Sequence, residues 1–140
     1  MKNEQSQIPN LKSIINKTEG LQHTSRQTVT PHDTARHHGS GDLSVLATPA
    51  LIALLENAAM LAVSPCLSPD ESTVGVEIAL SHKRASPVGS AIEATATLVK
   101  VDGRKLFFQL IAHDEKGEIG SGTHTRYIIH RKRFMEKVER

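Results

Sequence analysis

The chain has 140 residues, of which 38% are hydrophobic, 23% charged and 3% aromatic, and its formal net charge is +2. That length fits one domain with a single core and is too short for two ordinary domains. The near balance of acids and bases excludes the strong basic field of a general nucleic-acid-binding protein, so no nucleic-acid partner is expected. The single cysteine, Cys66, excludes an internal disulfide and a cysteine-based metal site, and it favours a reducing, cytoplasmic location.

Residues 1–20 are polar, and their few apolar residues recur at roughly helical spacing. They predict a short amphipathic helix or a loose arm in front of a domain at residues 21–140. The segment lacks the apolar h-region of a secretion signal. No stretch is expected to approach the length that spans a bilayer, so we expect a soluble protein without a membrane partner.

The first strand is expected within residues 21–30, and the polar residues 31–42 (PHDTARHHGSGD) are expected to form a surface loop. His32, His37 and His38 surround Asp33 in this loop. Their spacing matches no established zinc pattern, and all of them come from one loop, so no metal is expected.

Residues 48–63 (TPALIALLENAAMLAV) predict a helix with Thr48 as N-cap and Pro49 at the first helical position. Apolar residues surround it on almost every side, so we expect a central helix covered by a sheet. Only Glu56 and Asn57 interrupt the apolar surface. A carboxylate there needs a compensating partner, which makes Glu56 a candidate general base or nucleophile; a place on a narrow solvent strip is the alternative.

Four strands are expected after this helix, at residues 73–82, 91–101, 104–114 and 118–130, followed by a short basic helix at the C-terminus. Asp102-Gly103 predicts a tight hairpin turn in which both central residues have positive φ. Gly120 and Gly122 indicate close approach of another backbone or of a ligand. One long helix against an antiparallel sheet of about five strands is an α+β architecture in the order of the hot-dog fold, and its exposed edge strand favours a homodimer.

Thr48 and His82 are further candidate site residues. Alternation places Val74, Val76, Ile78 and Leu80 on one face of a strand together with His82, so His82 is expected near the layer that holds Glu56; a histidine bonded to a backbone carbonyl is the alternative. Thr48 lies at a helix N-terminus, where unpaired N–H groups suit a developing oxyanion. On a straight helix, eight residues separate Thr48 from Glu56 by about 12 Å, so a site containing both requires a second protomer.

Three motifs resemble the fluoroacetyl-CoA thioesterase family: PHDTARHH at residues 31–38, TPALIALLENAA at residues 48–59 and EIGSGTHTRYIIH at residues 118–130. The likeness covers about residues 20–137. It implies a hot-dog thioesterase that acts on an acyl-CoA substrate and uses no cofactor. It implies a catalytic set of Thr48, Glu56 and His82, and it associates Gly75 and Arg126 with substrate binding.

The resemblance also implies a difference in specificity. Residues 39–47 (GSGDLSVLA) are short and lack phenylalanine, whereas the fluoroacetyl-specific enzyme has a longer lid that contains one. We therefore expect hydrolysis of short acyl-CoA thioesters without strict fluoroacetyl specificity. The CoA phosphates have six basic candidates, for which a solvated surface is the alternative role: Lys83, Arg84, Arg126, Arg131, Lys132 and Arg133.

Two other functions stay open on the sequence. The first is a hot-dog enoyl-CoA hydratase, because Asp33 and His38 are five residues apart before the helix, like that family's acid–base pair, although the surrounding Asn-Pro is missing. The second is a non-catalytic acyl-CoA-binding module that keeps the fold without turnover.

Overall fold

The computed structural model describes residues 21–140, and the expected arm at residues 1–20 lies outside this range. The elements in chain order are β1 (Gln22–Thr28), the 3-10 helix η3 (Pro31–Asp33), α2 (Ala35–His38), α3 (Thr48–Val63), the 3-10 helix η4 (Ser64–Cys66), β2 (Glu71–His82), β3 (Ala91–Asp102), β4 (Lys105–Asp114), β5 (Gly117–His130) and α4 (Arg131–Val138). The expected strands are all present, and α3 has the expected bounds.

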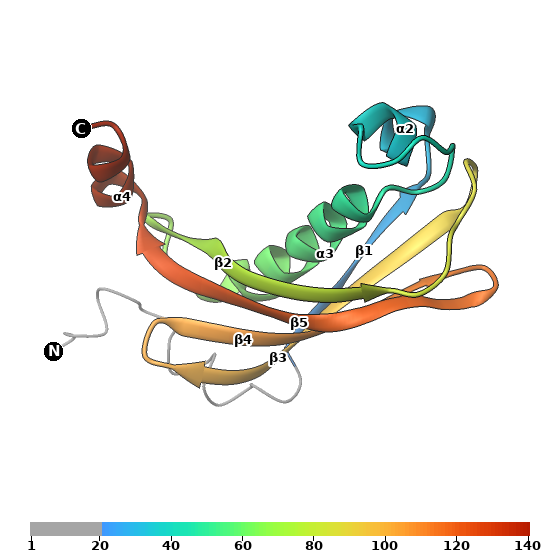
Figure 1. Cartoon of the computed structure of the whole chain (residues 1–140). Helices are drawn as coiled ribbons and strands as arrows, with labels where there is room; N and C mark the ends of the chain where they lie inside the picture. Colours follow the sequence, from blue (N-terminus) through green and yellow to red (C-terminus); the bar gives the residue numbers. More distant parts are fainter. Residues whose placement is uncertain (1–20) are drawn as a thin grey trace, which may run out of the picture.

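The strands form one antiparallel sheet in the order β1-β3-β4-β5-β2, so β1 and β2 are its edges. Figure 1 shows the sheet curving along one side of α3, with α2 near the first turn of α3 and α4 beyond the end of β5. The core lies between helix and sheet, where Leu51 and Leu55 of α3 meet Ile92, Leu98 and Phe108. The α+β prediction is confirmed.

A smaller part of the surface of α3 is buried than its apolar composition predicts. Its fully buried residues follow a helical stripe, Leu51, Leu55, Ala58, Ala59, Ala62 and Val63. Ala53 and Asn57 are exposed, because the sheet covers only one side of the helix. The expectation that this chain covers α3 on most sides is therefore wrong.

The segment Thr48–Cys66 has 19 residues and a mean hydropathy of 1.5, which by length and composition is enough to cross a membrane. The expectation that no stretch approaches that length is therefore wrong. In this fold the apolar side of the segment packs against the sheet.

A β-bulge changes the expected alternation of β2. The register against β5 shifts between Gly75 and Glu77, and Val76 is the additional residue. Val76 is 55% exposed, whereas Ile78 and Leu80 pack against the core. Because a bulge reverses which residues face inward, the prediction that Val76 shares the inner face of Ile78 is wrong.

The β3–β4 hairpin also differs from its prediction. Asp102 pairs with Lys105, so the central residues of the turn are Gly103 and Arg104. Gly103 has φ 62°, whereas Arg104, like every non-glycine residue among residues 21–140, does not have positive φ. Glycine at the first central position alone is the type II′ pattern, which also fits the twist of the strands.

Gly120 and Gly122 confirm the expected close approach, which comes from the backbone of β2. A Cβ atom on Gly120 would lie 2.9 Å from the Ser81 carbonyl oxygen, and one on Gly122 would overlap that of Ala79.

Residues 31–38 form two short helices where a loop was expected. Asp33 and Thr30 make a capping box that starts η3, and the Thr34 side chain accepts a hydrogen bond from the backbone N–H of His37. Gly39, with φ 73°, ends α2. The polar residues that suggested a loop thus act as helix caps.

Candidate active site

Thr48 and His82 meet at the N-terminal end of α3. Thr48 Oγ1 lies 2.8 Å from His82 Nδ1. The N-cap of the helix is Ala47, so the prediction of Thr48 as N-cap is wrong. Thr48 already has helical geometry, and its hydroxyl binds the imidazole instead of capping the helix. The hydroxyl is therefore placed for chemistry.

The other nitrogen of His82 has unused hydrogen-bonding capacity. Nε2 is buried and finds no hydrogen-bond partner within residues 21–140. Burial lowers the pKa of His82 below its usual 6.5, so the imidazole is neutral at neutral pH. A cavity of about 270 Å³ adjoins Thr48 and His82 and is also lined by Val45, Leu46 and Lys83. A neutral imidazole beside a cavity can accept or relay a proton.

Glu56 lies two turns further along α3 and faces the strand residues Gly75, His124 and Arg126. Glu56 Oε2 is 3.9 Å from both His124 Nε2 and Arg126 Nη1, and its side chain is 40% exposed. A Cβ atom at Gly75 would lie 2.6 Å from this oxygen, so glycine makes room for the carboxylate. Glu56 thus has both expected features: it lies on a solvent strip with the exposed Ala53 and Asn57, and the buried guanidinium of Arg126 is its cationic neighbour.

Arg126 is buried, with 7% of its surface exposed, and three hydrogen bonds hold its guanidinium in place. Its Nε donates to Thr73 Oγ1 at 2.8 Å, and its Nη2 donates to the Thr73 carbonyl oxygen at 2.9 Å. Its Nη1 donates to His124 Nε2 at 3.1 Å. Burial lowers the pKa of Arg126, and the charge of Glu56 acts against that shift. The charge beside Glu56 therefore has a fixed position.

Sequence reasoning missed His124 and Thr73. A signal for His124 was available, because it stands two residues before Arg126 on one strand and so shares its face. Thr73 carried no signal, since its contact with Arg126 depends on the pairing of β2 with β5.

Within one chain the predicted catalytic residues form two groups. Thr48 and His82 are together, and Glu56 is with Gly75 and Arg126. Seven residues of β2 separate Gly75 from His82, which is about 23 Å in an extended strand. The prediction that His82 lies near the layer of Glu56 is wrong for the single chain, and the predicted need for a second protomer is consistent with this separation.

The basic residues proposed for the CoA phosphates do not form one patch. Lys83 pairs with Glu118 at 2.6 Å, and Arg84 pairs with Asp114 at 2.7 Å. Arg131 donates to a backbone carbonyl, and Arg126 is buried. These partners account for most of the set.

Asp33, the candidate acid of a hydratase, is bound to its own loop. Burial acts to raise its pKa, but hydrogen bonds from the Thr30 backbone and hydroxyl, each 2.8 Å long, bring about a net lowering. Its carboxylate acts as a helix cap.

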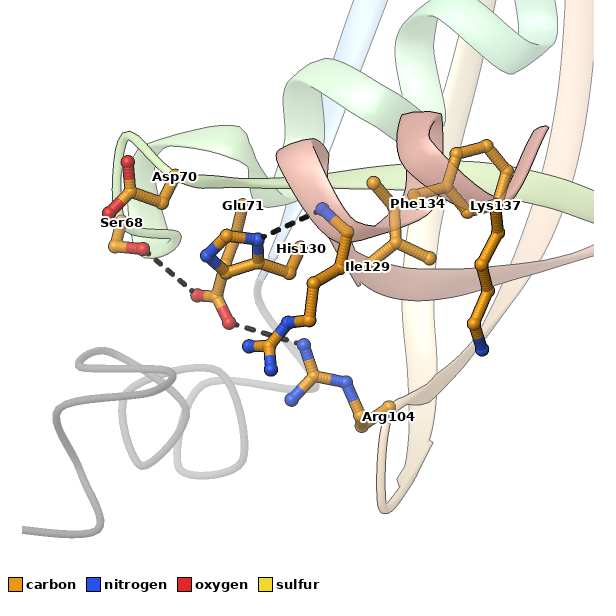
Figure 2. A pocket seen from close by; sticks show the side chains of 9 residues that line it. Ser68, Asp70, Glu71, Arg104, Ile129, His130, Phe134 and Lys137 are labelled. Atoms are coloured by element: carbon orange, nitrogen blue, oxygen red, sulfur yellow. Dashed lines mark hydrogen bonds and ion pairs between the residues drawn. The ribbon is translucent and has the colours of Figure 1, made fainter. Parts of the chain in front are cut away.

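A larger cavity, of about 500 Å³, lies between α4 and the start of β2. Figure 2 shows that Glu71 is flanked by Ser68 and Arg104 on one wall of it, and that Phe134 and Lys137 of α4 lie on the other side. Glu71 accepts hydrogen bonds from Ser68 at 3.1 Å and from Arg104 at 3.2 Å. Arg133, Lys137 and Asp70 also line the cavity and form no ion pair within residues 21–140, so two unpaired cations face one unpaired carboxylate there.

Comparison with known proteins identifies the family. The family model described as fluoroacetyl-CoA-specific thioesterase matches residues 29–132. A fluoroacetyl-CoA thioesterase from Streptantibioticus cattleyicolor is 40% identical over 116 residues, which cover 79% of this chain and 84% of that protein.

Solved structures agree with this match. A fluoroacetyl-CoA thioesterase variant in complex with acetyl-CoA superposes with a TM-score of 0.80 at 37% identity, over 84% of this chain and 93% of that one. A thioesterase superfamily member from Thermus thermophilus has the same fold at 24% identity, with a TM-score of 0.80 over 86% of this chain and 90% of that one. The prediction of a hot-dog thioesterase is confirmed, and the chain belongs to the fluoroacetyl-CoA-specific thioesterase family.

Proposed function

We propose that this chain hydrolyses short-chain acyl-CoA thioesters to the free acid and CoA, without a cofactor and in the cytoplasm. The proposal rests on one observation above all, the 2.8 Å contact between Thr48 Oγ1 and His82 Nδ1 at the start of a helix. Hydrolysis of a thioester needs donors for the developing oxyanion and a base for water. The Thr48 hydroxyl supplies a donor, and the Glu56 carboxylate beside Arg126 supplies a base.

The steps follow from these roles. In the tautomer that carries its proton on Nδ1, His82 donates to Thr48 Oγ1 and leaves the hydroxyl proton free for the thioester oxygen. The backbone N–H groups of Thr48 and Ala50 belong to the first turn of α3 and add further positive charge there. Glu56 takes a proton from water, whose oxygen forms the new C–O bond; the C–S bond then breaks, and the CoA thiolate leaves and takes up the proton that Glu56 holds. If the carboxylate itself attacks, the C–S bond breaks to leave a mixed anhydride on Glu56 and a CoA thiolate, and water then cleaves the anhydride to give the free acid and supplies the proton that the thiolate takes up.

The distances around the Glu56 carboxylate favour its role as the base. His124 Nε2 and Arg126 Nη1 each lie 3.9 Å from Glu56 Oε2, which is too far for a hydrogen bond. The lone pairs of Oε2 therefore stay free to accept a hydrogen bond from water. A carboxylate with direct hydrogen bonds from a guanidinium would be a weaker base.

The test is thiol release from acetyl-, fluoroacetyl- and propionyl-CoA, followed with a chromogenic thiol reagent. Glu56→Gln is expected to fold normally and to lose most turnover. Glu93→Gln, the same substitution at an exposed position on β3, is the control and should keep its turnover. Normal turnover by Glu56→Gln contradicts the assignment. Binding of CoA esters without release by the wild-type protein indicates a binding module instead.

We also propose that the site is assembled by a homodimer joined through β2. This edge strand has 12 residues, and Val76 on it is 55% exposed. If two copies pair antiparallel about a twofold axis between Ile78 and Ala79, His82 of one subunit lies opposite Gly75 of the partner subunit. The pairing would join the Thr48–His82 group of one subunit to the Glu56 group of the other.

Mixed dimers test the shared site. Thr48→Val and Glu56→Gln homodimers each lack one half of both sites and are expected to be inactive. After exchange in equal amounts, half of the dimers are mixed and contain one intact site, so about a quarter of the wild-type activity should return. No recovery in a sample shown to contain mixed dimers contradicts a shared site.

A variant of the edge strand tests the dimer itself. Val76→Lys should give a monomer of low activity, measured by sedimentation. Val99→Lys is a matched control, because Val99 is 44% exposed on the inner strand β3. A dimeric and active Val76→Lys protein would contradict this interface.

We place the phosphates of CoA in the cavity beside α4. Gly75 and Glu71 are four residues apart on β2, which is about 13 Å, a separation that an extended pantetheine arm can bridge. Arg133 and Lys137 offer positive charge for the phosphates, and Phe134 offers an apolar surface for the adenine ring of CoA. Replacing both cations by glutamine should raise KM for acyl-CoA and leave that for acyl-pantetheine unchanged. An equal change for both substrates contradicts the placement.

A further inference from the structure

His124 is a buried imidazole beside Glu56 that the steps above do not use. It is 2% exposed and stands on β5, with its ring 6.2 Å from that of Phe108. Its Nε2 is 3.9 Å from Glu56 Oε2, and its Cε1 would be 3.1 Å from a Cβ atom at Gly75. A residue this close to a catalytic carboxylate affects either its position or its charge.

The hydrogen bonds of His124 determine its tautomer. Nδ1 is 2.8 Å from the Glu77 carbonyl oxygen, which can only accept, so Nδ1 carries a proton. Nε2 is 3.1 Å from Arg126 Nη1, which can only donate, so Nε2 is the unprotonated nitrogen. The imidazole is therefore neutral and bonded on both sides.

The surroundings of His124 oppose a second proton. The charged groups that face it are Arg126 on its own strand and Glu56 on α3, and β2 contributes the Glu77 carbonyl. A proton on Nε2 would point at the guanidinium and would break the bond with Arg126. Burial, with the repulsion by Arg126, lowers the pKa of His124 despite the opposing effects of the Glu77 carbonyl and of Glu56.

His124 completes the hydrogen bonding of the Arg126 guanidinium. Thr73 binds Nε and Nη2, and His124 binds Nη1, the atom that faces Glu56; because the guanidinium is planar, this third bond sets its tilt toward the carboxylate. We propose that His124 is a positioning residue for the hydrolysis: as a neutral Nδ1–H imidazole it fixes the tilt of Arg126 and thereby the place of the positive charge beside the Glu56 carboxylate. This rests on the proposed function of Glu56.

Two substitutions separate positioning from packing. His124→Gln can keep an acceptor for Arg126, whereas His124→Phe fills the space beside Phe108 without one. We expect His124→Phe to fold and to lose about 10- to 100-fold in kcat with little change in KM, the range expected for one hydrogen bond to a charged group. His124→Gln should recover most of the loss. His113→Gln, a histidine on β4, is the control and should be unchanged.

Rescue by glutamine is the signature that packing alone would not produce, because glutamine returns an acceptor to Arg126 without restoring the imidazole ring. Equal losses of kcat in His124→Phe and His124→Gln would overturn the proposal.

Nuclear magnetic resonance decides the same point without turnover. The nitrogen shifts of His124 should report the Nδ1–H tautomer from pH 8 down to about pH 6, the ordinary range in which a free imidazole begins to protonate. The Arg126 guanidinium protons should be resolved in the wild-type protein and in His124→Gln, and averaged in His124→Phe. An imidazolium at neutral pH, or resolved Arg126 protons in His124→Phe, would overturn the proposal even if the chain proved not to hydrolyse thioesters.

Discussion

Replacing Gly75 by alanine should abolish most of the activity while it leaves the fold intact. The new Cβ atom would lie 2.6 Å from Glu56 Oε2, 3.1 Å from His124 Cε1 and 3.3 Å from Arg126 Nη1. The first distance is shorter than any stable contact, so a group must move. His124 and Arg126 are buried and hydrogen-bonded, whereas Glu56 is 40% exposed. The carboxylate is therefore the group that moves.

The size of the effect follows from the contact distances. Ordinary contact with a Cβ atom begins near 3.4 Å, so Oε2 must retreat by somewhat less than 1 Å. A misplacement of about 1 Å in a reacting group can cost about 100-fold in rate. The fold should tolerate the change, since Gly75 does not have positive φ and alanine costs less backbone entropy than glycine.

The assay is thiol release under saturating substrate, with thermal unfolding measured on the same samples. Gly41→Ala is the matched control, because Gly41 has no positive φ and its neighbour is the Ala35 side chain. The same change is then made in Glu56→Gln. If alanine at position 75 lowers the residual rate of Glu56→Gln by the same factor, it acts on another group and the reasoning is refuted.

Three further predictions concern other parts of the chain. Thr48→Val should lower kcat about 100- to 1,000-fold with little change in KM, measured by steady-state kinetics, because it removes a donor to the oxyanion. Because burial lowers the pKa of His82 below 6.5, that residue should stay neutral as the pH falls somewhat below 6.5, and its proton resonances should show no titration at that pH. Burial acts to raise the pKa of Asp114, but hydrogen bonds from Arg84, Ser86 and the Lys116 backbone lower it to about 2. The stability that this adds is complete above pH 3.8 and is lost as the pH falls toward 2. Chemical unfolding should therefore show a loss of about 2 kcal/mol over that range that Asp114→Asn does not show.

The elements of this fold were readable from the sequence because each rests on local signals. Periodicity and the turn residues located five strands, and leucine and alanine at helical spacing located α3. The errors arose where a distant contact decides the local geometry. The bulge at Val76 depends on how β2 pairs with β5, and one additional residue reverses which side chains face inward.

For the candidate site, the sequence predicted that Thr48 and Glu56 lie apart, but it did not predict which residues each of them contacts. A carboxylate in an apolar helix demanded a partner, and the structure supplies Arg126 and His124. Neither partner is near Glu56 in the sequence, so no spacing rule could pair them. Thr48 shows the opposite case, since its place at a helix start suggested a cap, and only the position of His82 reveals that its hydroxyl is bound elsewhere.

The two groups of candidate site residues have one feature in common. Each contains one neutral imidazole bonded to a polar partner, His82 to Thr48 and His124 to Arg126. Each imidazole is less basic than usual because it is buried. In the proposed mechanism the base, Glu56, and the oxyanion donor, Thr48, belong to different groups, so the proposal predicts that a single chain is a poor catalyst. Turnover should then depend on assembly. The edge strand β2, which pairs only with β5 within residues 21–140, carries both Gly75 and His82 and is therefore the element through which we expect two chains to join.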